Sequence, residues 1–166
     1  MIPVKVAKLG LDSAANAYVV VLQELDGERV LRIWIGRPEA ESIAMHINDV
    51  QRDRPITHDL CVSLLTGLGA TLRRAQVTHV HEGTFFAELH LVRSGAAVII
   101  DSRPSDAIAI ALRLDAPLFV HEALFEGGEG EAARESGAGD GGVLSAEQLQ
   151  HILEQMRPED FGRFSL

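Results

Sequence analysis

The chain has 166 residues, of which 46% are hydrophobic and 23% are charged, and its formal net charge is −9 at pH 7. This size and composition predict one globular domain with a real core, and the negative charge argues against a strongly basic nucleic-acid binder, whose affinity comes mostly from neutralising phosphates. No apolar run is long enough to cross a bilayer and no signal peptide is visible, so we expect a cytoplasmic protein with no membrane partner.

Three strands are predicted at the beginning of the chain, over residues 4–11, 17–25 and 30–35. The stretch 18–22 is apolar on both faces, which indicates a central strand. Asp26-Gly27 predicts a hairpin between the second and third strands, because glycine accepts the positive φ that a tight turn needs.

Two helices are expected next. After Pro38 the apolar residues follow a helical period, at Ala40, Ile43, Ala44, Ile47 and Val50. A second helix is predicted with Thr57 as its N-cap and Asp59 in its first turn, where the helix dipole favours a carboxylate. Gly69 can close this helix as a left-handed cap. Its expected buried stripe consists of Leu60, Leu64, Leu65 and Leu68.

The rest of the domain is predicted as strands at 72–81, 84–92 and 96–101, a helix opened by Pro104, and a short strand at 117–120. Turns at Glu82-Gly83 and Ser94-Gly95 would make the sheet mainly antiparallel. The order of elements indicates an α+β domain over residues 1–125, with a mixed, mainly antiparallel sheet packed against three helices.

The C-terminal part has a different composition. Residues 126–142 are rich in glycine and glutamate, which predicts a flexible linker. A capping box at Ser145 and Gln148 then predicts a final amphipathic helix and tail over residues 143–166. Apolar strand edges and this separate helix are compatible with a homo-oligomer.

Common catalytic and nucleotide-binding motifs are absent, including GxGxxG, GxxxxGK[ST], GxSxG, HExxH and CxxC. The single cysteine, Cys61, is expected to be a buried apolar residue. His79, His81 and Glu88 would share one face of a hairpin, where a solvated sheet surface is favoured over a metal site.

Two segments could carry chemistry. In Thr57-His58-Asp59 a helix start brings together a hydroxyl, an imidazole and a carboxylate, although capping alone explains two of the three. In the segment 101–106 a strand ends and a helix begins, which offers free backbone N–H groups and Arg103 to an anion. Asp101 and Asp106 could hold a hard cation there, and ordinary capping is an equally weighted alternative.

The sequence resembles the bifunctional nuclease domain family. The resemblance rests on Trp34-Ile35-Gly36, Glu39-Ala40, Arg54-Pro55 with Thr57-His58-Asp59-Leu60, the run Asp101-Ser102-Arg103-Pro104-Ser105-Asp106-Ala107-Ile108-Ala109, Arg113 and Ala116-Pro117. It covers about residues 4–120, and the closing 158–161 is also similar to bacterial members. Family members often have alanine at the position of Ser102, and the insert before the last helix is a departure.

The resemblance implies a compact α+β fold and hydrolysis of phosphodiester bonds in DNA and RNA. Our leading hypothesis is a metal-assisted nuclease of low sequence specificity that uses Mg²⁺ or Mn²⁺. The catalytic candidates are His58, Asp59, Arg103 and Asp106, the substrate-binding candidates are Arg103, Ser105 and Arg113, and the metal-binding candidates are Asp101, Asp106 and Glu39. The alternative is a non-catalytic regulatory or scaffolding module that binds a small anion or a protein partner. A third reading makes Arg103 and Asp106 purely structural.

Overall fold

The computed structural model describes residues 1–12 and 17–126. Its strands are β1 (Ile2–Asp12), β2 (Ala17–Glu24), β3 (Val30–Ile35), β4 (Ala70–His81), β5 (Thr84–Arg93), β6 (Ala96–Ser102) and β7 (Leu118–Val120). Its helices are α1 (Arg37–Ile47), α2 (Thr57–Gly67), α3 (Pro104–Arg113) and the short α4 (Ala123–Glu126).

The seven strands of the described residues belong to one sheet in the order β3-β2-β1-β7-β4-β5-β6. Neighbouring strands are antiparallel except β4 and β7, which are parallel. The predicted α+β class with a mixed, mainly antiparallel sheet is confirmed. The expected central strand, β2, is flanked on both sides but lies second from an edge, and the short β7 holds the centre by joining the two antiparallel halves.

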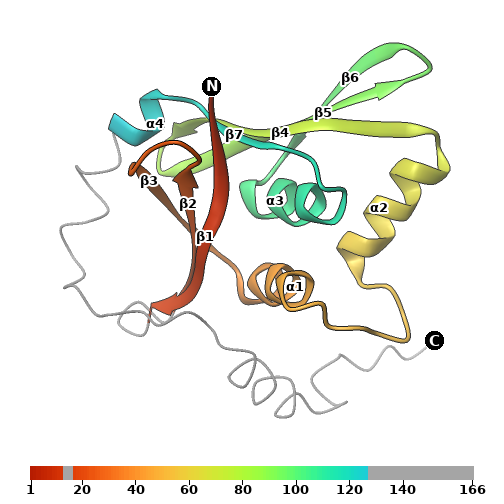
Figure 1. Ribbon diagram of the computed structural model, residues 1–166, viewed down its shortest axis with the longest axis horizontal. Helices are drawn as coiled ribbons and strands as arrows, with labels where there is room; N and C mark the ends of the chain where they lie inside the picture. The colour runs from red at the N-terminus through yellow and green to blue at the C-terminus, as the bar shows by residue number, and fades with distance from the viewer. Residues whose placement is uncertain (13–16, 127–166) are drawn as a thin grey trace.

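The helices α1 and α3 lie side by side within the curve of the sheet, and α2 packs against α3 and β4 (Figure 1). The largest fully buried side chains come from two strands and two helices: Val20, Leu22, Ile43, Ile108 and Val120. Each such side chain contributes about 1.5–3 kcal/mol by leaving water. This shared core fixes α1 and α3 against the sheet, which matters because both carry residues of the candidate site.

Two hairpin turns match their prediction. Glu82 and Gly83 have φ of 48° and 73°, and Ser94 and Gly95 have φ of 51° and 81°. Two successive residues with positive φ make the kind of tight turn whose twist fits the twist of the flanking strands. Glycine at the second position of each turn adopts this conformation without steric cost.

The ends of the first two helices differ from expectation. The helix α1 ends at Ile47, so the predicted apolar position Val50 lies outside it and is exposed. In α2, Ile56 is the N-cap and Thr57 is the first helical residue, so the predicted N-cap at Thr57 is wrong. The cap comes instead from Asp59, whose carboxylate accepts a hydrogen bond from the Ile56 backbone N–H at 2.9 Å.

The predicted buried stripe of α2 is also wrong. Leu60, Leu64 and Leu68 are more than half exposed, and only Leu65 of the predicted set packs partly against the core. The helix has two apolar faces, and the inward one carries His58, Cys61, Val62 and Leu65. The hydrogen bonds of His58 to Ser42 of α1 and Asp106 of α3 explain why this face of α2 is the buried one.

The short α4 was not predicted; its Leu124 and Phe125 are buried, and Arg29 from the β2–β3 connection lies over the Phe125 ring at 5.1 Å. The predicted linker and C-terminal helix lie outside the described residues, so their boundaries stay predictions. Within the described ranges, no helix combines the length and the apolar character needed to span a membrane.

Candidate functional site

His58 is the buried centre of a polar group at the junction of three helices. Its Nδ1 lies 2.8 Å from Ser42 Oγ, and its Nε2 lies 3.1 Å from Asp106 Oδ1. Ser42 belongs to α1, His58 to the first turn of α2 and Asp106 to the first turn of α3. The arrangement therefore depends on the packing of all three helices.

One assignment of protons satisfies all of these atoms. Neutral His58 donates from Nε2 to the Asp106 carboxylate, and its Nδ1 accepts from the Ser42 hydroxyl. Ser42 Oγ in turn accepts from Arg113 Nη2 at 3.0 Å. With both ring nitrogens engaged and only 8% of the residue exposed, His58 holds Asp106 in place rather than facing solvent.

Arg103 stands at the surface end of this group. Its Nε donates to Asp106 Oδ2 at 2.8 Å, and its Nη2 donates to Asp106 Oδ1 at 3.1 Å and to Glu39 Oε1 at 2.7 Å. Hydrogen bonds to Asp106 and Glu39 raise the pKa of Arg103 above its ordinary value. The Arg103 side chain is nonetheless 66% exposed, so its guanidinium is accessible from solvent.

The position of Arg103 follows from the sequence around it. Arg103 is the extended N-cap of α3, as expected for a residue that precedes proline, and Pro104 occupies the first turn, where its missing N–H costs nothing. This start places Asp106 in the first turn. Burial raises the pKa of Asp106, but hydrogen bonds from Arg103 and His58 outweigh that effect and leave the pKa below its ordinary value.

A second ion pair, between Arg113 and Asp59, lies at the buried end of the group. Arg113 Nε donates to Asp59 Oδ1 at 2.6 Å, and the other guanidinium nitrogens bind the backbone oxygens of Ala109 and Ser42. The Arg113 side chain is only 8% exposed. Burial raises the pKa of Asp59, but the Arg113 and Ile56 hydrogen bonds outweigh it and lower the pKa overall. The buried Arg113 therefore holds Ser42 and Asp59 in position through its hydrogen bonds.

The structure thus brings together most of the predicted site residues, which are Glu39, His58, Asp59, Arg103, Asp106 and Arg113. It does not bring Asp101 to them. Asp101 lies directly opposite Glu88 in the β5–β6 pair, whereas the adjacent Ala87 is buried against the helices. Because side chains alternate along a strand, Asp101 projects from the face of the sheet opposite to the helices. Ser105 is buried in α3 and is not among the hydrogen bonds of the group.

Sequence reasoning missed Ser42, which is 2% exposed and links His58 to Arg113. The available signal was a hydroxyl on the apolar face of a predicted helix, between Ala40 and Ile43. A buried hydroxyl needs a hydrogen-bonding partner, but the partner could not be named before the packing of the helices was known.

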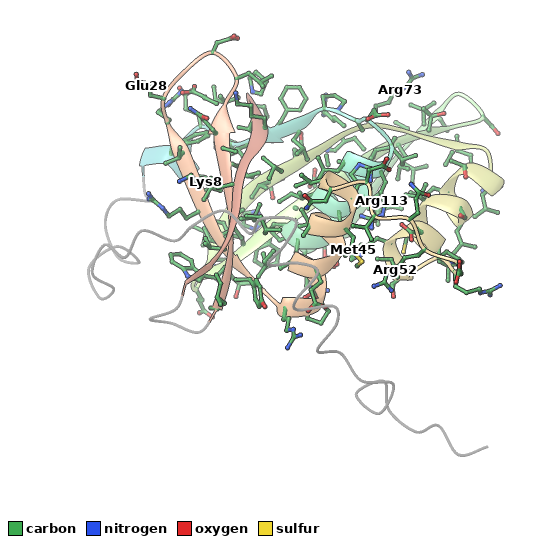
Figure 2. The ribbon with its side chains drawn as sticks, turned by 60° about the horizontal axis from the view of Figure 1, so that its bottom comes forward. Lys8, Glu28, Met45, Arg52, Arg73 and Arg113 are labelled. Atoms are coloured by element: carbon green, nitrogen blue, oxygen red, sulfur yellow. The ribbon has the colours of Figure 1, made fainter. Side chains whose placement is uncertain are left out.

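An open pocket of about 360 Å³ lies beside the group, between the α1–α2 connection and α3. Figure 2 shows Arg113 close to Met45 and to Arg52 of this connection. Arg52 donates to the Met45 sulfur at 3.0 Å. Asp59 and Arg113 line the pocket, so solvent approaches the Asp59 side of the group through it.

The histidines on the sheet form no comparable group. His79 stacks on Phe86 with ring centroids 4.5 Å apart, and Glu88 binds His90 and Gln76 at 2.8 and 3.0 Å. His79 and His81 are exposed, in agreement with the favoured solvated surface. Within residues 1–12 and 17–126, no three side chains of His, Cys, Asp or Glu are arranged to hold a metal ion.

Comparison with known proteins identifies relatives. Residues 20–131 match the family described as the bifunctional nuclease domain. An uncharacterised protein of Mycobacterium tuberculosis is 35% identical over 165 residues, which cover 95% of this chain and 96% of that protein. Bifunctional nuclease 2 and bifunctional nuclease 1 of Arabidopsis thaliana are 35% and 36% identical over 120 and 111 residues.

The plant matches cover 69% and 63% of this chain but only 36% and 34% of those proteins. The chain therefore spans about a third of the length of these plant nucleases. The matched region includes all three helices that form the His58 group. By its sequence and over most of its length, the chain belongs to the bifunctional nuclease domain family.

Proposed function

We propose that this protein is a nuclease that hydrolyses phosphodiester bonds of DNA and RNA with low sequence specificity. The observation that carries the proposal is the exposed guanidinium of Arg103, held between the carboxylates of Glu39 and Asp106. Its Nε and Nη2 donate to these carboxylates, which leaves Nη1 to donate hydrogen bonds to a phosphate. The names of the plant relatives support the same reaction class.

Each residue has a distinct task in this proposal. Arg103 binds the scissile phosphate, and Asp106, which is ionised and accepts hydrogen bonds at both oxygens, orients the attacking water, which releases its proton to solvent. The water oxygen forms the new P–O bond, the bond to the leaving oxygen breaks, and the leaving oxygen takes a proton from solvent. His58 keeps Asp106 oriented, while Ser42 and Arg113 keep His58 in place.

Two carboxylates of the group are candidates to hold a divalent cation together with a substrate phosphate, because no larger set of metal-binding side chains gathers among the described residues. Glu39, Asp59 and Asp106 oppose only two guanidinium groups, so a phosphate would meet a group that is short of positive charge. Glu39 and Asp106 both bind Arg103 Nη2, and Mg²⁺ in proteins commonly uses one or two carboxylates together with substrate phosphates. We propose these two residues as the holders of Mg²⁺ or Mn²⁺, which would polarise the phosphate and activate water. Asp101 faces the other side of the sheet and is left out.

The test is cleavage of labelled single-stranded RNA and DNA by purified full-length protein in Mg²⁺, Mn²⁺ or EDTA. Asp106→Asn and Asp101→Asn form a matched pair, since both remove one carboxylate near the β6–α3 junction. We expect metal-dependent cleavage that falls by about 100-fold or more in Asp106→Asn and persists in Asp101→Asn. Equal activity of Asp106→Asn and wild type would refute the site.

One observation favours the non-catalytic alternative. Both arginines of the group are paired with carboxylates, so the group carries no surplus positive charge for a polyanion. A regulatory module would show no metal-dependent turnover in any of the three proteins. In the purely structural reading, Asp106→Asn would lower the melting temperature and change no binding or cleavage.

A further inference from the structure

The strand β6 forms an edge of the sheet that the rest of the described chain leaves open. It is the last strand in the order, and residues 96–100 read Ala-Ala-Val-Ile-Ile, with no charged side chain. Val98, Ile99 and Ile100 are 40%, 60% and 41% exposed. An edge strand with free backbone groups and apolar side chains is a template for pairing with another strand.

The exposure of β6 has a clear structural cause. Val98 and Ile100 lie opposite Leu91 and Leu89, which are buried, so all four side chains point to the helical side of the sheet. The helices α1, α2 and α3 pack mainly on β2, β4 and β5, and Val98 and Ile100 stay 40% and 41% exposed. The result is an overhanging strand with an apolar surface toward the helices and Ile99 on the opposite face.

The usual protection of an edge is missing here. Proteins protect edge strands with lysine, proline, bulges or a covering element. The β5–β6 pairing is regular from Ala96 to Ser102, while β1 and β4 both contain register shifts. The opposite edge, β3, carries Arg32 and contacts α4. Of the two edges in the described sheet, β6 is the unprotected one.

The outer face of α2 carries a second exposed apolar surface. Leu60, Leu64 and Leu68 are 52%, 56% and 60% exposed and follow one another at helical spacing. Arg93, at the end of β5, donates to the Leu68 backbone oxygen at 3.0 Å, which ties this end of α2 to the β5–β6 turn. We call the three leucines together with Val98, Ile99 and Ile100 the β6–α2 surface.

We propose that the β6–α2 surface binds a second copy of this chain, with the two β6 strands pairing antiparallel across a two-fold axis. A strand paired antiparallel with itself is self-complementary, as a two-fold interface requires. Each copy carries a net charge of −9, so two copies repel one another except where the surface lacks charge. The stretch 96–100 is such a surface.

Pairing of two β6 strands would remove apolar side chains from water on both faces of the sheet. Val98 and Ile100 lie on the helical face and Ile99 on the opposite face, and they are 40%, 41% and 60% exposed. A stable two-protein interface removes about 800 Å² from each partner, so a dimer requires the backbone edge of β6 to be buried together with these side chains.

The experiment is sedimentation equilibrium of the full-length protein across a concentration series, with three lysine variants. Val98→Lys and Leu64→Lys place a charge in the proposed interface. Val80→Lys is the matched control, because Val80 is a 45% exposed strand residue outside the surface. We expect a dimer for wild type and Val80→Lys, and a dimer dissociation constant raised at least about tenfold in the other two.

Hydrogen exchange of the β6 amides distinguishes the occupants of the edge. Protection that rises with protein concentration in wild type, and not in Val98→Lys, is expected for pairing between copies. Protection that is independent of concentration would mean that another segment of the same chain covers β6, and would overturn the proposal. A monomeric wild type, or a dimer unaffected by Val98→Lys, would overturn it as well. Thermal melting of each variant confirms that the comparison is between folded proteins.

Discussion

His58 and Asp106 are 48 residues apart in the sequence, yet His58 Nε2 lies 3.1 Å from Asp106 Oδ1. This contact joins the first turn of α2 to the first turn of α3. Because Arg103 binds both oxygens of the same carboxylate, Asp106 is fixed from two directions. Its orientation is therefore set by the packing of the helices.

Ser42→Ala tests whether this orientation depends on the buried hydroxyl. The change leaves His58 Nδ1 without its donor and Arg113 Nη2 without one of its acceptors. An unsatisfied buried polar group costs about 1–3 kcal/mol, so we expect a loss of that size in the free energy of unfolding measured with urea. Ser63→Ala is the control, because Ser63 is exposed and binds only the Asp59 backbone oxygen. Equal losses in the two variants would contradict the bracing role of Ser42.

The sequence predicted the architecture well because strands and turns leave local signals. The Glu82-Gly83 and Ser94-Gly95 turns, the α+β class and Pro104 at the start of α3 are all confirmed. The central position of β7 could not be predicted, because three residues contain no information about which strands will flank them. Only the packing of the two antiparallel halves decides that position.

The leucines of α2 show why burial is harder to predict. The helix has two apolar faces related by a small rotation, and hydrophobicity favours the leucine-rich one. The structure buries the face of His58 and exposes Leu60 and Leu64, since polar contacts with Ser42 and Asp106 are made only in that rotation. For the site, residue types pointed to His58 and Asp106 separately, but their contact and the role of Ser42 needed the tertiary structure.

Asp59 predicts the behaviour of the protein in acid. The pKa of Asp59 is lowered in the folded protein, so its contribution to stability is present above the ordinary aspartate pKa of about 3.9 and is lost as pH falls through the lower folded value. Asp106 shifts in the same direction. We expect the melting temperature to fall steeply below about pH 4.

Asp59→Asn should make the fall of the melting temperature below about pH 4 less steep, because the replaced group no longer titrates. It should also destabilise the protein at pH 7 by about 2 kcal/mol, since Arg113 is buried and loses a charged acceptor. Asp26→Asn, in an exposed turn, serves as the control for a change of one charge. If the melting temperature falls equally steeply in Asp59→Asn and wild type below about pH 4, Asp59 does not contribute to the acid sensitivity.

Two glycines give opposite predictions for the same substitution. Gly95 has a φ of 81°, whereas Gly67 lies in α2 with no atom within 4 Å of an added Cβ. Gly95→Ala should destabilise the protein by about 1 kcal/mol or more, and Gly67→Ala should stabilise it by about 0.4–1 kcal/mol through the unfolded state. Thermal denaturation of both variants beside wild type measures the difference, and a stabilising Gly95→Ala would contradict the turn conformation.

Ser102→Ala is expected to be neutral or stabilising, although Ser102 adjoins the candidate site. Ser102 Oγ is buried and has no hydrogen-bond partner among the described residues. Its removal relieves a desolvation cost of about 1–3 kcal/mol, offset in part by the small space left behind. Cleavage by Ser102→Ala should match wild type in the assay used for Asp106→Asn, because the hydroxyl makes no hydrogen bond to any of the proposed catalytic groups. A loss of stability would show that the hydroxyl has a partner in solution, such as an ordered water, and a loss of cleavage alone would assign that hydroxyl to the substrate.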